Sequence, residues 1–237
     1  MNRGYSAEIM LTTTRIDPEQ AARRLQLELW DRQCALWPGG SVTPLDVCDP
    51  WVAARYLGYE VQEGWLSSTG TAPGFQLGGF ISRPAMVIAV SAEQKPRTQL
   101  FTLAHEVGHV LMHPGLHHHR ETPIHGLTEP REPTDPKERE ANRFAGCFLV
   151  PEKQLRLAFL ACFGEKNLNL TDNVAWELLG GSYTSLMNAP SHSLAFERVV
   201  AQAKHFGGHH FRALHELFDV SPTTMAIRLR ETGLVLR

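Results

Sequence analysis

Residues 101–113 read FTLAHEVGHVLMH and contain the pattern H-E-x-x-H at His105, Glu106 and His109. Over the segment 97–113, apolar residues recur at helical spacing, so we expect a helix there. Residues four apart lie one above the other on a helix, which points both imidazoles in the same direction. Two histidines in this arrangement can bind a single zinc ion, so the sequence predicts a metal site on this helix.

Glu106 follows His105 directly, so on a helix it is turned by about 100° and lies beside a bound metal instead of coordinating it. A carboxylate in that position can take a proton from a zinc-bound water, because the metal lowers the pKa of that water to about 7. We therefore expect Glu106 to act as a general base. The alternative is a surface helix that carries two solvated histidines.

A catalytic zinc ion needs a third protein ligand and one open coordination position. A second helix is expected over residues 136–148, and it carries EREANRFA at residues 138–145. Glu138 shares a face with two alanines, whose small side chains allow another helix to approach closely. Glu140 is rotated by about 200° from Glu138 and is expected to face solvent. The sequence therefore favours Glu138 as the third ligand, the alternative being that both are ordinary surface glutamates.

The rest of the chain predicts an α+β fold, rich in helices, with a small and mostly antiparallel sheet of about three strands. Asp-Pro pairs at residues 17–18 and 49–50 are typical of helix starts. Three segments with strand character lie between residues 59 and 90, and the polar stretch 114–133 predicts a loop. Further helices are expected over residues 152–162, 172–179, 192–205, 209–218 and 222–232.

Charge and composition argue against several classes of protein. The 23 Lys and Arg residues against 25 Asp and Glu residues give a formal net charge of −2, unlike a strongly basic nucleic-acid binder. The longest purely apolar run, residues 85–90, is far short of the roughly 20 residues that cross a membrane, and no cleaved signal is expected at the N-terminus. The four cysteines are widely spaced without a C-x-x-C pair, which favours reduced, mostly buried thiols in a cytoplasmic protein.

Four stretches of the sequence resemble the ImmA/IrrE family of metallopeptidases over roughly residues 50–235: FTLAHEVGHVLMH, EREANRFAGCFLVP, GGFISRPAMVIAVS and LFDVSPTTMAIRLRETGLV. The resemblance implies a thermolysin-like zinc peptidase core, with His105, His109 and Glu138 as the ligands and Glu106 as the catalytic glutamate. It also implies a substrate class. The known members of this family cleave helix-turn-helix repressor proteins that control stress-response or mobile-element genes.

We accordingly expect three parts: an N-terminal helical extension (residues 1–48), a zinc peptidase core (49–190) and a C-terminal helical subdomain with a helix-turn-helix-like end (191–237). The predicted function is a zinc-dependent endopeptidase of narrow specificity whose partner is a protein, and the resemblance implies that this protein is such a repressor. Direct nucleic-acid binding is not expected, because the last helix offers only Arg228 and Arg230 to phosphates. That helix is instead expected to pack against the protein or to dock a partner.

The competing hypothesis is a non-catalytic regulatory protein with a structural or vestigial metal site, which sequesters a repressor or pairs with a toxin or antitoxin. A structural zinc site needs a fourth protein ligand, typically Cys or His. Cys147 is on the same predicted helix as Glu138, but at nine residues from it the cysteine lies on the opposite side of that helix and is a poor fourth ligand. This spacing favours the enzyme.

The sequence offers candidates, but no single residue, for the oxyanion site and for the substrate edge. The residue that stabilises the oxyanion has four equivalent candidates, namely His113, His125, Tyr183 and His192. A substrate strand is expected to pair with a sheet edge formed by residues 75–81 or 86–90. The tract His117–His119 is expected to be part of a solvated loop, and His209-His210 is expected to start a helix.

Overall fold

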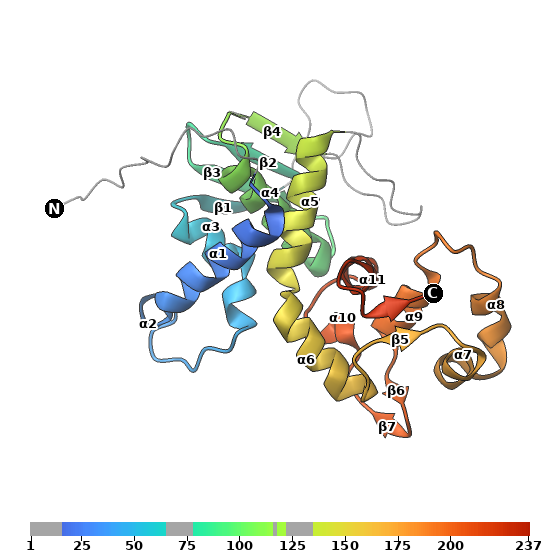
Figure 1. Cartoon of the computed structure of the whole chain (residues 1–237). Coiled ribbons are helices and arrows are strands. Elements are labelled where there is room, and N and C mark those ends of the chain that lie inside the picture. The colour runs from blue at the N-terminus through green and yellow to red at the C-terminus, as the bar shows by residue number, and fades with distance from the viewer. Residues whose placement is uncertain (1–15, 65–77, 116–117, 122–134) are drawn as a thin grey trace.

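The computed structural model describes residues 16–64, 78–115, 118–121 and 135–237, and it confirms the α+β class (Figure 1). One part of the molecule comprises a sheet with helices α1, α3, α4 and α5, and the other comprises helices α6 to α11. The helices are α1 (Pro18–Asp31), α2 (Gln33–Leu36), α3 (Pro50–Tyr56), α4 (Pro96–Met112), α5 (Pro136–Leu149), α6 (Glu152–Phe163), α7 (Asp172–Leu179), α8 (Tyr183–Met187), α9 (Ala195–Gln202), α10 (Leu214–Leu217) and α11 (Pro222–Glu231).

The sheet is mixed and has four strands in the order β1-β3-β2-β4. Strand β1 (Glu60–Gly64) runs parallel to β3 (Val87–Ser91), whereas β2 (Gly79–Ser82) is antiparallel to both β3 and β4 (His118–Glu121). The expectation of about three strands therefore missed β4, which lies where a polar loop was predicted. Its polar sequence has no strand periodicity, and its backbone pairing with β2 overrides the weak local preference.

The positions of the strands also correct the expected substrate edge. Strands β2 and β3 each pair on both sides, so they are interior strands and β1 and β4 form the edges. The prediction that residues 79–81 or 86–90 offer a free edge is wrong, while residues 75–77 lie outside the described part of the chain. Sequence alone could not reveal this order, because the pairing that covers β2 comes from a segment without a strand signal.

Three helix starts follow the same local chemistry. Asp17, Asp49 and Asp135 each precede a proline, and each side chain accepts a hydrogen bond from the backbone N–H two residues later, at 3.0, 2.8 and 2.8 Å. These bonds satisfy N–H groups that have no partner inside the helix, and the proline loses nothing because its position needs no N–H donor. The predicted starts of α1, α3 and α5 are thus confirmed.

The helix predicted over residues 209–218 is mostly wrong. Strand β7 (His209–His210) pairs with β6 (His205–Phe206) in a short hairpin, and helix α10 begins only at Leu214. The two residues between the strands, Gly207 and Gly208, have φ values of 59° and 73°. Two consecutive residues with positive φ form the tight turn that hairpins prefer, which explains why this segment turns back instead of coiling.

Close packing of α4 and α5 builds the centre of the molecule. Phe144 and Phe148 of α5 are fully buried with ring centroids 5.8 Å apart, and they belong to the same core as Leu103 and Val107 of α4. A side chain at Gly108 would not fit, because its Cβ would lie 2.9 Å from the Phe144 ring. Gly108 thus lets the two helices that carry the predicted ligands approach each other.

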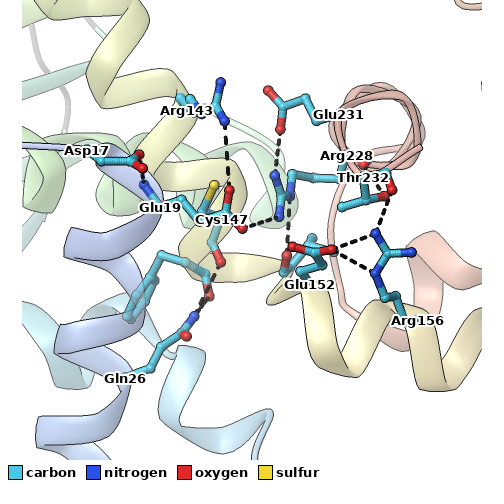
Figure 2. A network of polar contacts seen from close by, with 12 residues as sticks. Asp17, Glu19, Gln26, Arg143, Cys147, Glu152, Arg156, Arg228, Glu231 and Thr232 are labelled. Carbon is cyan, nitrogen blue, oxygen red and sulfur yellow. Dashed lines mark hydrogen bonds and ion pairs between the residues drawn. The ribbon is translucent and has the colours of Figure 1, made fainter. Parts of the chain in front are cut away.

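Arg228 of α11 is almost fully buried and connects the last helix to α1 and α5 (Figure 2). Its Nη1 donates to Glu231 at 2.6 Å, its Nε donates to the Val150 carbonyl at 3.3 Å, and its Nη2 lies 3.9 Å from a Glu19 oxygen. The neighbouring Arg230 pairs with Glu197 at 2.7 Å. Both arginines of the last helix are therefore engaged within the protein.

Two further observations bear on the sequence predictions. Within the described ranges, no helix combines the length and the apolar character needed to span a membrane. All four cysteines fall inside those ranges and are free thiols, three of them buried and Cys34 exposed. The division of the chain at residues 48/49 and 190/191 stays a prediction.

Candidate metal centre

His105 and His109 of α4 and Glu138 of α5 converge at the interface of the two helices. The Nε2 atoms of the two histidines lie 2.9 Å apart, and the two oxygens of Glu138 lie 3.3 Å from His105 Nε2 and 3.4 Å from His109 Nε2. Both imidazoles are fully buried, and the Glu138 side chain is 23% exposed. The structure thus brings together the three residues that the sequence predicts as ligands, and in the described ranges they form the one such cluster that could hold a metal ion.

The donor set fits a divalent cation. His105 Nδ1 lies 2.8 Å from Asn142 Oδ1, and an amide oxygen can only accept, so Nδ1 carries the proton and Nε2 presents its lone pair to the cluster. The unprotonated Nε2 of His105, the Nε2 of His109 and the carboxylate of Glu138 are three electron-pair donors in close contact. Such a set is unfavourable unless a proton or a cation lies among them, and two nitrogens with one carboxylate oxygen are the ligands of many catalytic zinc sites.

Glu140 corrects one expectation. It was predicted to face solvent, but its side chain is only 16% exposed and its Oε2 lies 3.0 Å from His113 Nε2. Helical geometry turns Glu140 away from Glu138, but not into solvent, because His113, which follows directly after the end of α4, contacts its carboxylate. His113 Nδ1 in turn lies 2.9 Å from His109 Nδ1. Glu140 therefore belongs to the surroundings of the cluster and not to the solvated face of α5.

The oxyanion candidates lie elsewhere or are already engaged. Both ring nitrogens of His113 contact the partners just described, so the ring has no nitrogen left for a substrate oxygen. The Tyr183 ring packs edge-on against Trp176 at 5.6 Å, and His192 is exposed with its backbone carbonyl accepting from Arg230 at 3.1 Å. His125 lies outside the described residues. Of the described candidates, only His113 contacts a residue of the cluster, and it does so through His109.

Glu106 is fully buried, and its carboxylate lies against strand β2. A Cβ atom built on Gly79 would lie 2.5 Å from Glu106 Oε1 and 2.8 Å from Thr102 Cγ2. Strand β2 can pass this close to α4 only because residue 79 has no side chain. Gly79 was not singled out from the sequence, since nothing local distinguishes a glycine beside a carboxylate from a glycine in a turn.

Arg83, which follows β2, holds the end of α4. Its Nη2 donates to the backbone carbonyls of His109, Val110 and His113 at 2.7, 3.1 and 3.0 Å. The last carbonyls of a helix have no partner within it, and a positive charge is favourable at this end. Arg83 thereby fixes the backbone of the turn that carries His109.

Two residues that contact the ligands, Asn142 and His113, could have been found from their spacing in the sequence, since Asn142 follows Glu138 by four and His113 follows His109 by four.

Cys147 is not part of the cluster. Its backbone carbonyl accepts from the Gln26 side chain at 3.3 Å on the α1 side of α5, as Figure 2 shows, and burial raises the pKa of its thiol to about 12. Among the residues that the structure describes, no fourth His, Cys, Asp or Glu joins His105, His109 and Glu138. Three protein ligands are typical of a catalytic zinc site, whereas a structural site has four.

A histidine pair on one helix, a glutamate on the next and a second glutamate within H-E-x-x-H together define a metallopeptidase-like domain. Residues 71–176 match the family model of the IrrE N-terminal-like domain, Peptidase_M78, and this range includes both helices of the cluster. This stretch, just under half of the chain, is similar to that domain, and the match is consistent with the resemblance to the ImmA/IrrE family. No curated protein matches the chain.

Proposed function

We propose that this protein is a cytoplasmic zinc-dependent endopeptidase of narrow specificity that cleaves a helix-turn-helix transcriptional repressor in a stress-response or mobile-element circuit. The observation that carries the proposal is the convergence of His105, His109 and Glu138 within a domain that matches a peptidase family. The choice of repressor as substrate rests on the family resemblance.

The cluster supplies the ligands, and Glu106 supplies the proton chemistry. A bound zinc ion polarises a carbonyl group and makes water acidic at neutral pH. Glu106, one residue after the first ligand, takes the proton of the attacking water and passes it to the leaving amine. Glu106 is fully buried against β2, which limits the positions that its carboxylate can take, and a defined position favours proton transfer.

The internal pairing of the two C-terminal arginines supports a protein partner over a nucleic acid. Arg228 and Arg230 are engaged with Glu231 and Glu197, so neither presents a free charge to a phosphate. The formal net charge of −2 adds no electrostatic attraction to a polyanion. We propose that the last helix packs within this protein while the repressor is recognised elsewhere.

The test is to incubate the zinc-loaded protein with the repressor-like product of a neighbouring gene, with and without a chelator. We expect a discrete repressor fragment that is absent with chelator and absent with Glu106→Gln. Binding of the intact repressor by the zinc-loaded protein, with no fragment formed, would contradict the enzyme and support the non-catalytic regulatory protein instead.

A further inference from the structure

We propose that His113 and Glu140 are positioning residues that fix the protonation pattern of His109, so that its Nε2 faces the metal site as a bare donor. The inference rests on the proposed metal site but concerns residues that the ligand set does not include. It assigns to the chain a hydrogen-bonded relay, His109–His113–Glu140, which we call the imidazole relay.

The direction of each hydrogen bond follows from the carboxylate. An ionised Glu140 can only accept, so His113 Nε2, at 3.0 Å, carries a proton and donates it. In a neutral imidazole the other nitrogen then has none, so His113 Nδ1 accepts. The donor at 2.9 Å is therefore Nδ1 of His109, which leaves His109 Nε2 without a proton and with its lone pair available to a metal ion.

That lone pair points into the cluster. His109 Nε2 lies 2.9 Å from His105 Nε2 and 3.4 Å from Glu138 Oε1. Asn142 fixes the same pattern on His105 through a single amide oxygen, at 2.8 Å from Nδ1. Both ligands thus carry the proton on Nδ1, but the partner of His105 is a neutral amide, whereas the relay from His109 ends on the carboxylate of Glu140. The negative charge makes Nε2 of His109 the more basic of the two donors.

The residues of the relay are shielded from water, which could otherwise replace their hydrogen bonds. The side chains of His113 and Glu140 are 6% and 16% exposed, so bulk water has little access to replace either bond. Arg83 donates to the backbone carbonyls of both His109 and His113. This contact holds the backbone of the two residues in place even if one hydrogen bond between the side chains is lost. Loss of the relay should therefore change which ring nitrogen of His109 carries the proton, without unfolding the end of α4.

The experiment combines zinc affinity with ¹⁵N NMR of the histidine rings in the metal-free protein. His113→Phe keeps a ring but removes the acceptor, and Glu140→Leu removes the end of the relay, whereas Glu140→Gln keeps an oxygen that accepts from His113. His215→Phe is the matched control, since His215 is also a buried histidine and contacts Arg97 at 3.2 Å instead of the cluster.

We expect His113→Phe and Glu140→Leu to bind zinc about 10- to 100-fold more weakly, with Glu140→Gln and His215→Phe near the wild-type affinity. In the metal-free wild type, His109 should carry its proton on Nδ1, and this pattern should become mixed in His113→Phe. Wild-type protein with the proton on Nε2, or equal losses of affinity in His113→Phe and His215→Phe, would overturn the inference.

These readouts separate the relay from the proposed function. If the loaded protein cleaves no repressor but the two relay variants lose zinc affinity as expected, the relay stands and the peptidase proposal fails. If the wild type binds no zinc at all, the proton position on His109 in the metal-free protein still decides whether the relay exists.

Discussion

The Nε2 atoms of His105 and His109 lie 2.9 Å apart, and Glu138 contributes one oxygen within 3.4 Å of each. Two buried imidazole nitrogens rarely face each other at this distance unless a proton or a cation lies between them. The hydrogen bond from His105 Nδ1 to Asn142 removes the proton on one side. The relationship between these two nitrogens is therefore the strongest physical reason to expect a metal ion at this place.

Glu106→Gln should abolish peptidase activity and leave zinc binding intact. The amide keeps the size of the side chain but cannot take a proton, and general-base catalysis contributes about 10²- to 10⁴-fold. The measurement is the rate of repressor cleavage beside the zinc content of the same preparation. A variant that retains zinc and more than a tenth of the activity would contradict the role of Glu106.

Gly79→Ala should damage both stability and activity. The new methyl group would lie 2.5 Å from Glu106 Oε1, so either β2 or the carboxylate must move. Overpacking of this kind costs about 1–3 kcal/mol. Denaturant unfolding and cleavage rates measure the two effects. The control is Gly64→Ala in β1, where a Cβ meets nothing within 4 Å, and an equal loss in both variants would refute the close approach.

The buried thiols should resist ionisation until the protein unfolds. Burial raises the pKa values of Cys48 and Cys147 from 9.0 to about 12. Between these values the unfolded chain has lost its thiol protons while the folded chain keeps them, so folding stability is full below pH 9 and falls as the pH rises toward 12. Denaturant midpoints across this range test the slope.

Thiol labelling supplies the control for this prediction. At pH 8 a thiol reagent should modify the exposed Cys34 rapidly, and the three buried cysteines only after denaturant is added. Rapid labelling of Cys48 or Cys147 in the native protein would show that these thiols are not buried as the structure places them.

Arg228→Met should destabilise the protein by about 1.5–3 kcal/mol, because it removes hydrogen bonds between a buried charged group and its partners. The free energy of unfolding measures the effect. Arg24→Met is the control, since Arg24 pairs with Glu28 at 3.3 Å with 72% of its side chain exposed, and such pairs contribute at most about 1 kcal/mol. Equal effects of the two variants would contradict the anchoring role of Arg228.

The sequence predicted the parts of the site that follow from helical spacing. His105 and His109 lie on one helix, Glu138 on the next, and the Asp-Pro starts of α1, α3 and α5 are where the local chemistry places them. Spacing of this kind depends only on the geometry of one helix. The close approach of α4 and α5 was also anticipated from the small residues of α5, although Gly108 of α4 was not.

What the sequence could not predict depends on contacts between distant segments. Strand β4 has no strand signal of its own, and its pairing with β2 turns the expected edge strand into an interior one. The contact of Glu140 with His113 joins α5 to the residue that follows the end of α4. Gly79 and Arg83 act on α4 from the strand and turn before it, and no local pattern marks either of them for that task.

The metal site is tested most sharply by X-ray absorption spectroscopy at the zinc edge on protein loaded with one equivalent of zinc, with zinc content measured for the wild type and for Glu138→Gln. We expect one zinc per chain, with two imidazole nitrogens and a carboxylate oxygen at about 2.0–2.2 Å. Glu138→Gln should lose zinc clearly, whereas the control Glu165→Gln, at an exposed position, should not. A sulfur ligand at about 2.3 Å, or full zinc content in Glu138→Gln, would contradict this metal site.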